Sequence, residues 1–161
     1  MILLDTSVLS LALRRRGRPE GESRRPAAAL VTMVMEDWQL AIPGIVVQEL
    51  LSGVRTPAEV ERLEEALAGF PVVLADHDDH LRAARIANQC RAAGITASTI
   101  DCLIAALALR REAELFTTDG DFADIAACCE LRLFVPAPPP LRAVLSDEEL
   151  RRRGSSHLRP N

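Results

Sequence analysis

The chain has 161 residues, of which 23 are acidic and 19 are basic, so its net charge is −4. All of the basic residues are arginine, which excludes a P-loop NTPase and enzymes that form a Schiff base on lysine. Aromatic residues make up only 3% of the chain, so the core must be aliphatic, and the acidic balance argues against a protein that coats DNA.

Short apolar segments alternate with helical patterns along the first 135 residues. We expect strands at 2–4, 39–42, 72–74, 115–117 and 131–135, and helices at 5–13, 26–37, 44–52, 57–68, 78–93, 98–112 and 122–129. This alternation predicts an α/β fold with three layers, in which helices flank a mostly parallel central sheet.

The composition divides the chain into two parts. Residues 1–135 have the length and apolar content of a single domain. From Pro136 the sequence becomes rich in proline and then in charge, so 136–161 is predicted to be a tail. An arginine-rich loop at 14–25 either reaches RNA phosphates or is simply solvated, and the sequence favours neither alternative.

The first residues and the cysteines indicate a cytoplasmic protein with no membrane association. Asp5 interrupts the apolar start of the chain, no basic segment precedes it, and no apolar run approaches the ~20 residues that span a bilayer. The four cysteines show no CxxC spacing, and we expect them to be small buried side chains in a reducing compartment.

Two acidic residues stand beside apolar segments that should be buried. Asp5 ends the first predicted strand, where it can cap the next helix, but ligands of open parallel sheets also bind beyond the carboxyl ends of strands. Glu49 shares a helix face with Ile45 and Val46, which favours a partly buried carboxylate over a solvated one.

Three further acids follow the same pattern. Asp101 matches a capping box with Ser98, yet the helix that it opens is apolar on all sides, as in a buried helix. Asp119 and Asp121 follow the fourth strand and could form a simple Asp-Gly turn, but the chain continues as a helix and not as a hairpin.

Together these acids predict a metal site at one edge of the sheet. Two carboxylates ~6 Å apart repel by about 3 kcal/mol at an effective dielectric constant near 20, and no lysine is present to compensate. Carboxylates without histidine or cysteine select Mg²⁺, with Mn²⁺ as the alternative, and such a site suits the hydrolysis of a phosphodiester. A haloacid-dehalogenase phosphatase would need an acid where Ser7 stands, and a response-regulator receiver would need a late lysine.

Four short motifs resemble those of the PIN-domain ribonucleases, in particular the VapC-type toxins of toxin–antitoxin pairs. They are Leu3-Leu4-Asp5-Thr6-Ser7, Gln48-Glu49-Leu50 with Gly53, Asp101-Cys102-Leu103-Ile104-Ala105-Ala106, and Thr117-Thr118-Asp119-Gly120-Asp121-Phe122. The resemblance spans residues 1 to about 135 and implies a Mg²⁺-dependent endoribonuclease of PIN fold that forms a homodimer and is inhibited by an antitoxin.

The resemblance also implies roles for individual residues. Asp5, Glu49, Asp101 and Asp119 match the catalytic acids of the family, and with Asp121 they are the expected metal ligands. Thr6 and Thr118 are the expected contacts to the RNA substrate, to water or to the carboxylates. Two alternatives stay open: a PIN nuclease for RNA maturation or repair without an antitoxin, and a PIN-like RNA-binding module that has lost catalysis.

Overall fold

The computed structural model describes residues 1–13 and 24–137. Its strands are β1 (Ile2–Leu4), β2 (Leu40–Pro43), β3 (Val72–Val73), β4 (Glu114–Phe116) and β5 (Arg132–Leu133). Its helices are α1 (Thr6–Leu13), α2 (Arg24–Met35), α3 (Gly44–Ser52), α4 (Pro57–Leu67), α5 (His77–Ala92), α6 (Thr99–Arg110) and α7 (Asp121–Cys128). Most of the predicted loop at 14–25 and of the predicted tail at 136–161 lies outside the described residues.

The strands form one parallel sheet in the order β3-β2-β1-β4-β5. The predicted α/β architecture is therefore confirmed, and within the described ranges the sheet is parallel throughout. β1 lies in the middle, and its Ile2 pairs with Leu40 of β2 on one side and with Glu114 of β4 on the other. All carboxyl ends of the strands consequently meet at a single edge.

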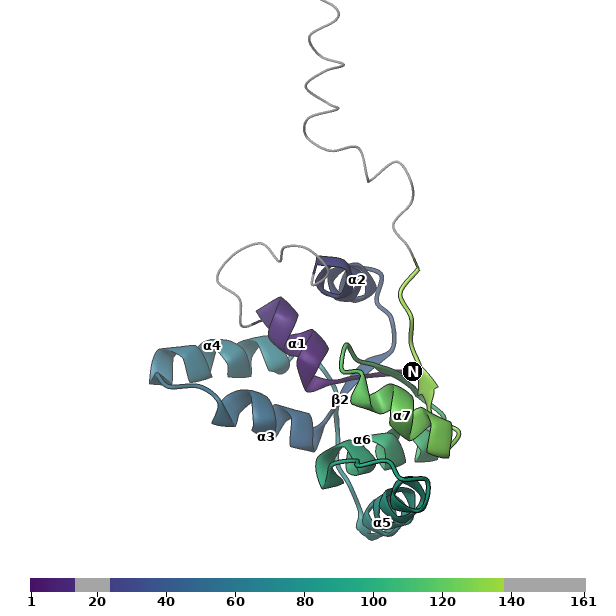
Figure 1. The fold of residues 1–161 in the computed structure, drawn as a ribbon. Helices are drawn as coiled ribbons and strands as arrows, with labels where there is room; N and C mark the ends of the chain where they lie inside the picture. Colours follow the sequence, from purple (N-terminus) through teal and green to yellow (C-terminus); the bar gives the residue numbers. More distant parts are fainter. Residues whose placement is uncertain (14–23, 138–161) are drawn as a thin grey trace, which may run out of the picture.

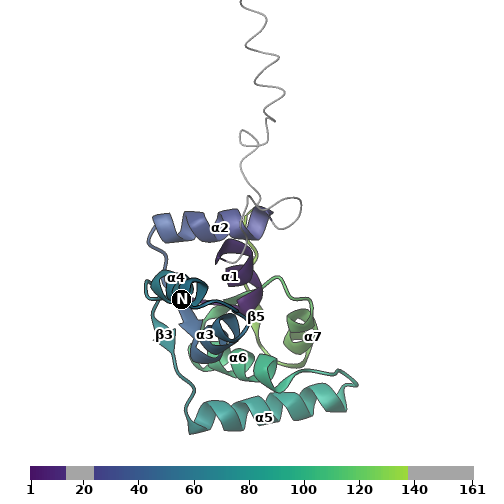
Figure 2. The same ribbon diagram turned by 90° about the vertical axis from the view of Figure 1, so that its left-hand side faces the viewer.

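Helices enclose the sheet and account for the apolar character of its central strands. All three residues of β1 and all four of β2 are buried, because strands covered on both faces need apolar side chains throughout. Figures 1 and 2 show α5 and α6 lying side by side at one end of the molecule, with α2 at the opposite end. α6 is buried along most of its length, as its apolar sequence predicts. No helix in the described ranges is long and apolar enough to cross a membrane.

Most boundaries differ from the predicted ones by one or two residues, and α3 agrees with its prediction. The predicted helix at 26–37 is observed at Arg24–Met35, and Asp37 instead takes a positive φ of 54° in the turn that follows. β5 is shorter than predicted: its paired residues are Arg132 and Leu133, and the backbone N–H of Phe134 makes one further hydrogen bond, to the Leu115 carbonyl of β4.

A group of four charged residues fixes the start of α5 against the end of α6; we call Asp76, Asp79, Arg110 and Arg111 the α5 ion-pair group. Asp76 caps α5 by accepting a hydrogen bond from the backbone N–H of Asp79 at 3.0 Å, and the Asp79 carboxylate accepts one in return from the N–H of Asp76. Asp79 is fully buried and lies 3.1 Å from Arg110 and 3.4 Å from Arg111. A charge that is buried in this way needs such partners.

Candidate active site

The predicted acids lie at the carboxyl edge of the sheet. Asp5 directly follows β1, and Asp119 and Asp121 follow β4, the neighbour of β1. Asp101 lies in the first turn of α6, and Glu49 lies in α3, which begins where β2 ends. Parallel strands bring Asp5, Asp119 and Asp121 together, because the segments that follow β1 and β4 begin at the same edge of the sheet.

Asp5 is held rigidly at the end of β1. Only 5% of its surface is exposed, and one carboxylate oxygen, Oδ2, accepts three hydrogen bonds. The donors are the backbone N–H of Ser7 at 3.2 Å, the Ser7 hydroxyl at 2.6 Å and the Thr117 hydroxyl at 2.9 Å. Asp5 therefore caps α1, as one alternative predicted, and its orientation is fixed by neighbours on both sides.

The hydroxyls of Ser7 and Thr117 also join α1 to the loop after β4. The Ser7 hydroxyl accepts a hydrogen bond from the N–H of Thr118 at 2.9 Å, and the Thr117 hydroxyl accepts one from the N–H of Asp119 at 2.9 Å. The two hydroxyl oxygens lie 3.2 Å apart. Sequence reasoning missed both residues, although their two-residue spacing from Asp5 and Asp119 is the spacing at which short hydroxyl side chains bond to neighbouring backbone.

Thr6 links the first helix to Glu49. Its hydroxyl donates a hydrogen bond of 2.6 Å to Oε2 of Glu49, which is half-buried on α3. The predicted pairing of a threonine with a carboxylate is thus present at Thr6. For Thr118, the described contact is made by its backbone N–H and not by its side chain. Their roles as contacts to RNA remain predictions.

The pKa of Asp101 is affected both by burial and by the neighbouring carboxylates. Ser98 is the N-cap of α6: its hydroxyl accepts from the N–H of Asp101 at 3.0 Å and donates to Oδ2 of the same residue at 2.5 Å. Burial raises the pKa of Asp101, the Ser98 hydroxyl opposes this effect, and the carboxylates of Asp119, Asp5 and Asp121 raise the pKa further.

The structure thus brings three other predicted acids within electrostatic reach of Asp101; we call Asp5, Asp101, Asp119 and Asp121 the sheet-edge acids. Glu49 is connected to them through Thr6, the residue next to Asp5. In the part of the chain that the structure describes, no arginine or histidine forms an ion pair with any of these five carboxylates. Their mutual repulsion is left without a cation from the described chain.

The donor atoms fit a hard divalent cation in chemistry, although they do not form a complete ligand cage. Within residues 1–13 and 24–137, no group of three or more His, Cys, Asp or Glu side chains is arranged so that it could hold a metal ion. Mg²⁺ keeps several waters and is commonly held by only one or two carboxylates, so it does not require such a cage. An uncompensated set of carboxylate oxygens is the kind of donor set that this ion prefers.

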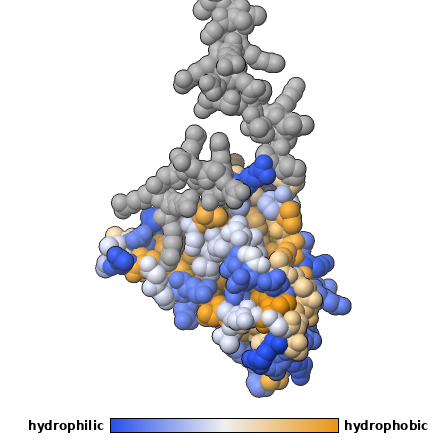
Figure 3. Space-filling model, viewed as in Figure 1, coloured by the Kyte–Doolittle hydropathy of each residue, from blue (hydrophilic) through white to orange (hydrophobic). Residues whose placement is uncertain are grey.

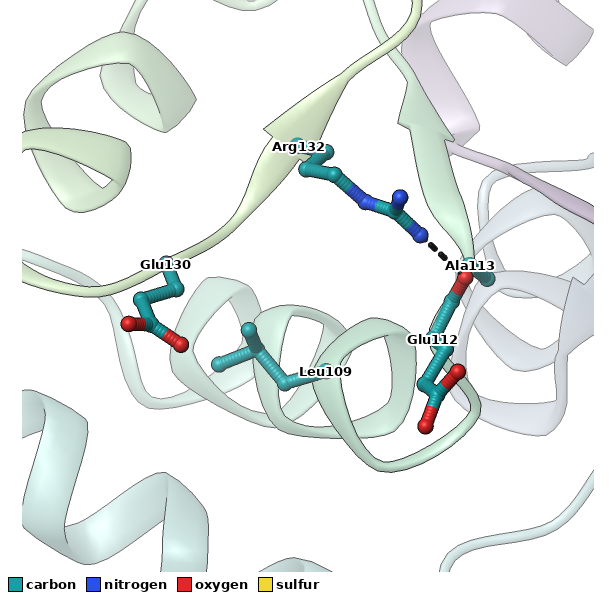
Figure 4. Close-up of a pocket in the computed structure, with 5 residues that line it drawn as sticks. All are labelled: Leu109, Glu112, Ala113, Glu130 and Arg132. Atoms are coloured by element: carbon teal, nitrogen blue, oxygen red, sulfur yellow. Dashed lines mark hydrogen bonds between the residues drawn. The ribbon is translucent and has the colours of Figure 1, made fainter.

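Two hollows lie at different ends of the sheet, and only the first is near these acids. One of about 340 Å³ begins beside Asp101, between α5 and the start of α6, with Ile45 and Ile100 in its apolar wall. The other, of about 430 Å³, lies between the end of α6 and the start of β5 and contains Glu112, Glu130 and Arg132 (Figure 4). Arg132 donates a hydrogen bond to the Glu112 carbonyl there. Because the second hollow is at the amino ends of the strands, it is remote from the sheet-edge acids.

The surface around the start of α7 is mixed in polarity. On the face shown in Figure 3, hydrophilic residues gather near the centre, and hydrophobic residues border them. Asp119, Gly120 and Asp121, which lead into α7, are all exposed. The sheet-edge acids are therefore accessible from solvent on the side of Asp119 and Asp121, although Asp5 is nearly buried.

Comparison with known proteins identifies the class to which this fold and site belong. The PIN domain matches residues 2–127, and the chain belongs to the PIN domain family. Its relatives include VapC ribonuclease Mb1587 of Mycobacterium bovis and ribonuclease VapC11 of Mycobacterium tuberculosis. Each is 35% identical over 135 residues, which cover 82% of this chain and 96% of the relative.

Solved structures agree with this assignment. The crystal structure of FitAcB from Neisseria gonorrhoeae is similar to this chain, with a TM-score of 0.68 and 26% identity over 84% of this chain and 98% of that one. A toxin–antitoxin complex from Klebsiella pneumoniae shares the fold, with a TM-score of 0.61 and 23% identity over 85% of this chain and 98% of that one.

Proposed function

We propose that this protein is a Mg²⁺-dependent endoribonuclease that hydrolyses RNA phosphodiesters and acts as the toxin of a type II toxin–antitoxin pair. The observation that carries the proposal is the group of sheet-edge acids, which converge without an arginine partner in the described chain. Membership of the PIN family and 35% identity to proteins named VapC ribonuclease support the choice of reaction and substrate.

Asp5, Asp101 and Asp119 would hold the ion, with Glu49 and Asp121 as further carboxylates beside it; Mn²⁺ could replace Mg²⁺. A bound ion of this kind supplies Lewis-acid polarisation of the phosphodiester and a lowered pKa for its water, and the expected products carry a 3′-hydroxyl and a 5′-phosphate.

The residues of the chain itself provide orientation. Three hydrogen bonds to Oδ2 hold the Asp5 carboxylate in one orientation, which leaves its second oxygen available to the ion. Ser98 orients Asp101, and Thr6 orients Glu49. Fixing these side chains before the substrate binds removes a reorganisation cost from the reaction. Thr118 is exposed and precedes Asp119, so its side chain can contact RNA beside that carboxylate.

The proposal includes the partners of such a toxin: an antitoxin protein that inhibits it, a second copy of the chain in a homodimer, and a cytoplasmic location where RNA is available. Among the similar structures, the one from Klebsiella pneumoniae is a toxin–antitoxin complex. A small neighbouring gene for a DNA-binding protein would favour a toxin over a nuclease for RNA maturation or repair.

The test is RNA cleavage by the purified chain on defined RNAs, with Mg²⁺ and with EDTA, with product ends mapped to single bases. Replacing Asp5 and Asp101 together by Asn should abolish cleavage and growth arrest while the circular dichroism spectrum stays unchanged. The matched control is Asp124→Asn. This change removes an exposed carboxylate from α7, one turn after Asp121. Cleavage that persists in EDTA, or growth arrest by the double variant equal to that of the parent, would contradict the proposal.

The same assay tests the remaining alternative, a PIN-like module that binds RNA without cutting it. The absence of a complete ligand cage among the described residues is the observation that favours this alternative. RNA binding by filter retention with no cleavage at any Mg²⁺ or Mn²⁺ concentration would establish it.

A further inference from the structure

The hollow of about 340 Å³ between α5 and the start of α6 is mostly apolar. Its wall includes Ile45 of α3, Ala84 and Ala87 of α5, and Ile100 and Leu103 of α6. α5 and α6 pack along each other (Figure 2), and the short alanine side chains of α5 do not fill the space at this point. The volume is at the lower end of the range for small-molecule sites, so it suits one flat group of the size of a nucleobase.

Two helices carry both the wall of this hollow and an acid of the candidate active site. Ile45 and Glu49 are four residues apart on α3, so they lie on the same face of the helix, one turn from each other. On α6, the wall residue Ile100 directly precedes Asp101. The hollow therefore begins within one turn of two of the predicted acids along their helices.

Two polar side chains, His80 of α5 and Thr99 of α6, also line the hollow. Both residues are exposed, and neither side chain makes a hydrogen bond to another of the described residues. An imidazole and a hydroxyl can each donate and accept hydrogen bonds. Unpaired RNA bases are recognised by contacts to their flat faces and by hydrogen bonds to their edges, and the hollow offers groups for both.

An arginine lies one turn beyond the hollow. Arg91 follows Ala87 by four residues on the same face of α5, at the end of the helix that leads toward α6. Its guanidinium donates a hydrogen bond of 2.8 Å to Oδ1 of Asn88, but no carboxylate of the described chain forms an ion pair with it. An unpaired positive charge next to an apolar hollow is complementary to the phosphate of a nucleotide.

We propose that this hollow is a specificity pocket for the RNA substrate. It holds the base of one unpaired nucleotide near the scissile phosphodiester, while Arg91 contacts a phosphate of the same strand. The inference rests on the proposed function, because it takes RNA to be bound at the sheet-edge acids. Since a base in a duplex is stacked and paired, the pocket favours single-stranded RNA.

RNA binding without cleavage tests the pocket. The full-length chain is kept in EDTA, and its dissociation constant for a short, fluorescein-labelled single-stranded RNA of mixed sequence is measured by fluorescence anisotropy. Ala84→Phe places a ring in the hollow from an exposed position, so binding should weaken about tenfold through the loss of one base contact. The matched control is Ala92→Phe, which adds the same ring to an exposed position of α5 outside the hollow and should leave the dissociation constant unchanged.

The salt dependence of binding tests the phosphate contact separately. Arg91→Ala should weaken binding and reduce the slope of log affinity against log salt concentration by about 0.7, the value for one phosphate of a single strand. The control is Arg82→Ala, which removes an exposed arginine two and a half turns earlier and therefore on the opposite side of α5. This control should leave the slope unchanged.

Three results would overturn the pocket. The first is binding by Ala84→Phe equal to that of the parent, with an unchanged circular dichroism spectrum. The second is an equal loss of binding in Ala84→Phe and Ala92→Phe. The third is a loss of self-association by Ala84→Phe in size-exclusion chromatography with light scattering, because a second copy of the chain would then cover the hollow. If the parent fails to cleave RNA in Mg²⁺ while Ala84→Phe still weakens binding in EDTA, the pocket is supported and only the proposed nuclease function is contradicted.

Discussion

The α5 ion-pair group and the sheet-edge acids are both sets of carboxylates, but they differ in what surrounds them. In the first, two carboxylates face two arginines, and the most buried of them has an arginine nitrogen 3.1 Å away. In the second, three carboxylates act on the charge of Asp101, and no arginine of the described chain pairs with any of the four. Within the described residues, arginines of the protein neutralise the first group, whereas no side chain pairs with the second, which leaves protons or a bound cation to neutralise it.

One carboxylate in each group has a shifted pKa, and the two shifts have opposite directions for this reason. The hydrogen bond from Arg110 and the N–H of Asp79 lower the pKa of Asp76 to about 2. Burial and the neighbouring carboxylates raise the pKa of Asp101. A carboxylate whose charged form is stabilised by the fold adds to the free energy of unfolding. A carboxylate whose charged form is destabilised by the fold lowers it, which is typical of acids at functional sites.

The largest expected effect comes from removing a charge at the sheet edge. Asp101→Asn should lower RNA cleavage about 1000-fold, or about 4 kcal/mol in transition-state stabilisation, because a metal ligand is lost. The same change should leave the free energy of unfolding unchanged or raise it, because it removes a carboxylate that its neighbours repel. Single-turnover cleavage and urea denaturation in EDTA measure the two quantities.

A loss of RNA cleavage without a loss in the free energy of unfolding distinguishes a functional acid from a structural one. Asp124→Asn, on the exposed side of α7, should change neither quantity. If Asp101→Asn lost stability in parallel with activity, Asp101 would be a structural residue like those of the α5 ion-pair group.

The reverse pattern is expected at Asp79. Asp79→Ala leaves Arg110 and Arg111 without their buried partner and removes half of the α5 capping box, so the free energy of unfolding should fall by about 3 kcal/mol. Cleavage per folded molecule should stay near that of the parent. The neighbouring Asp78→Ala, which removes an exposed carboxylate from the same helix turn, is the matched control and should cost far less in urea denaturation.

Only one of the two groups, the sheet-edge acids, could be predicted from the sequence. The sheet-edge acids could be predicted because each follows an apolar strand or opens an apolar helix, and a parallel sheet then brings them together. The helix at 44–52 was predicted with its observed ends, since Gly44 and Gly53 bound it.

The remaining features depend on contacts between distant parts of the chain. The Thr117 hydroxyl reaches Asp5 across 112 positions, and Arg110 reaches Asp76 across 34. A helix was predicted at 78–93, but nothing in its sequence indicates that Asp79 is buried and Asp78 exposed. Short-range patterns identify elements and their caps, whereas the partner of a charge is decided by packing.

Ser98→Ala should have a smaller effect that touches both activity and stability. Loss of the N-cap of α6 should lower the free energy of unfolding by about 1 kcal/mol. Because the Ser98 hydroxyl lowers the pKa of Asp101, its removal should raise that pKa, and the acidic limb of the cleavage–pH profile should move to higher pH. Ser98→Thr keeps the hydroxyl and should restore both quantities, whereas a profile that does not move in the alanine variant would separate Ser98 from the chemistry.

The smallest expected effects are the pH dependences of stability, which should have opposite signs in the two groups. The folded-state pKa of Asp76 lies below its ordinary value of 3.8, so its stabilising contribution is present above pH 4 and is lost as the pH falls toward 2. The folded-state pKa of Asp101 lies above its ordinary value, so its destabilising contribution is present at neutral pH and disappears as the pH falls through that raised pKa.

Urea midpoints measured in EDTA from pH 7 to pH 2 for the parent, Asp76→Asn and Asp101→Asn give each contribution as a difference. Asp76→Asn should flatten the acid end of the curve, and Asp101→Asn should remove the gain at mildly acidic pH. If both differences had the same sign, the two groups of carboxylates would not be neutralised in different ways.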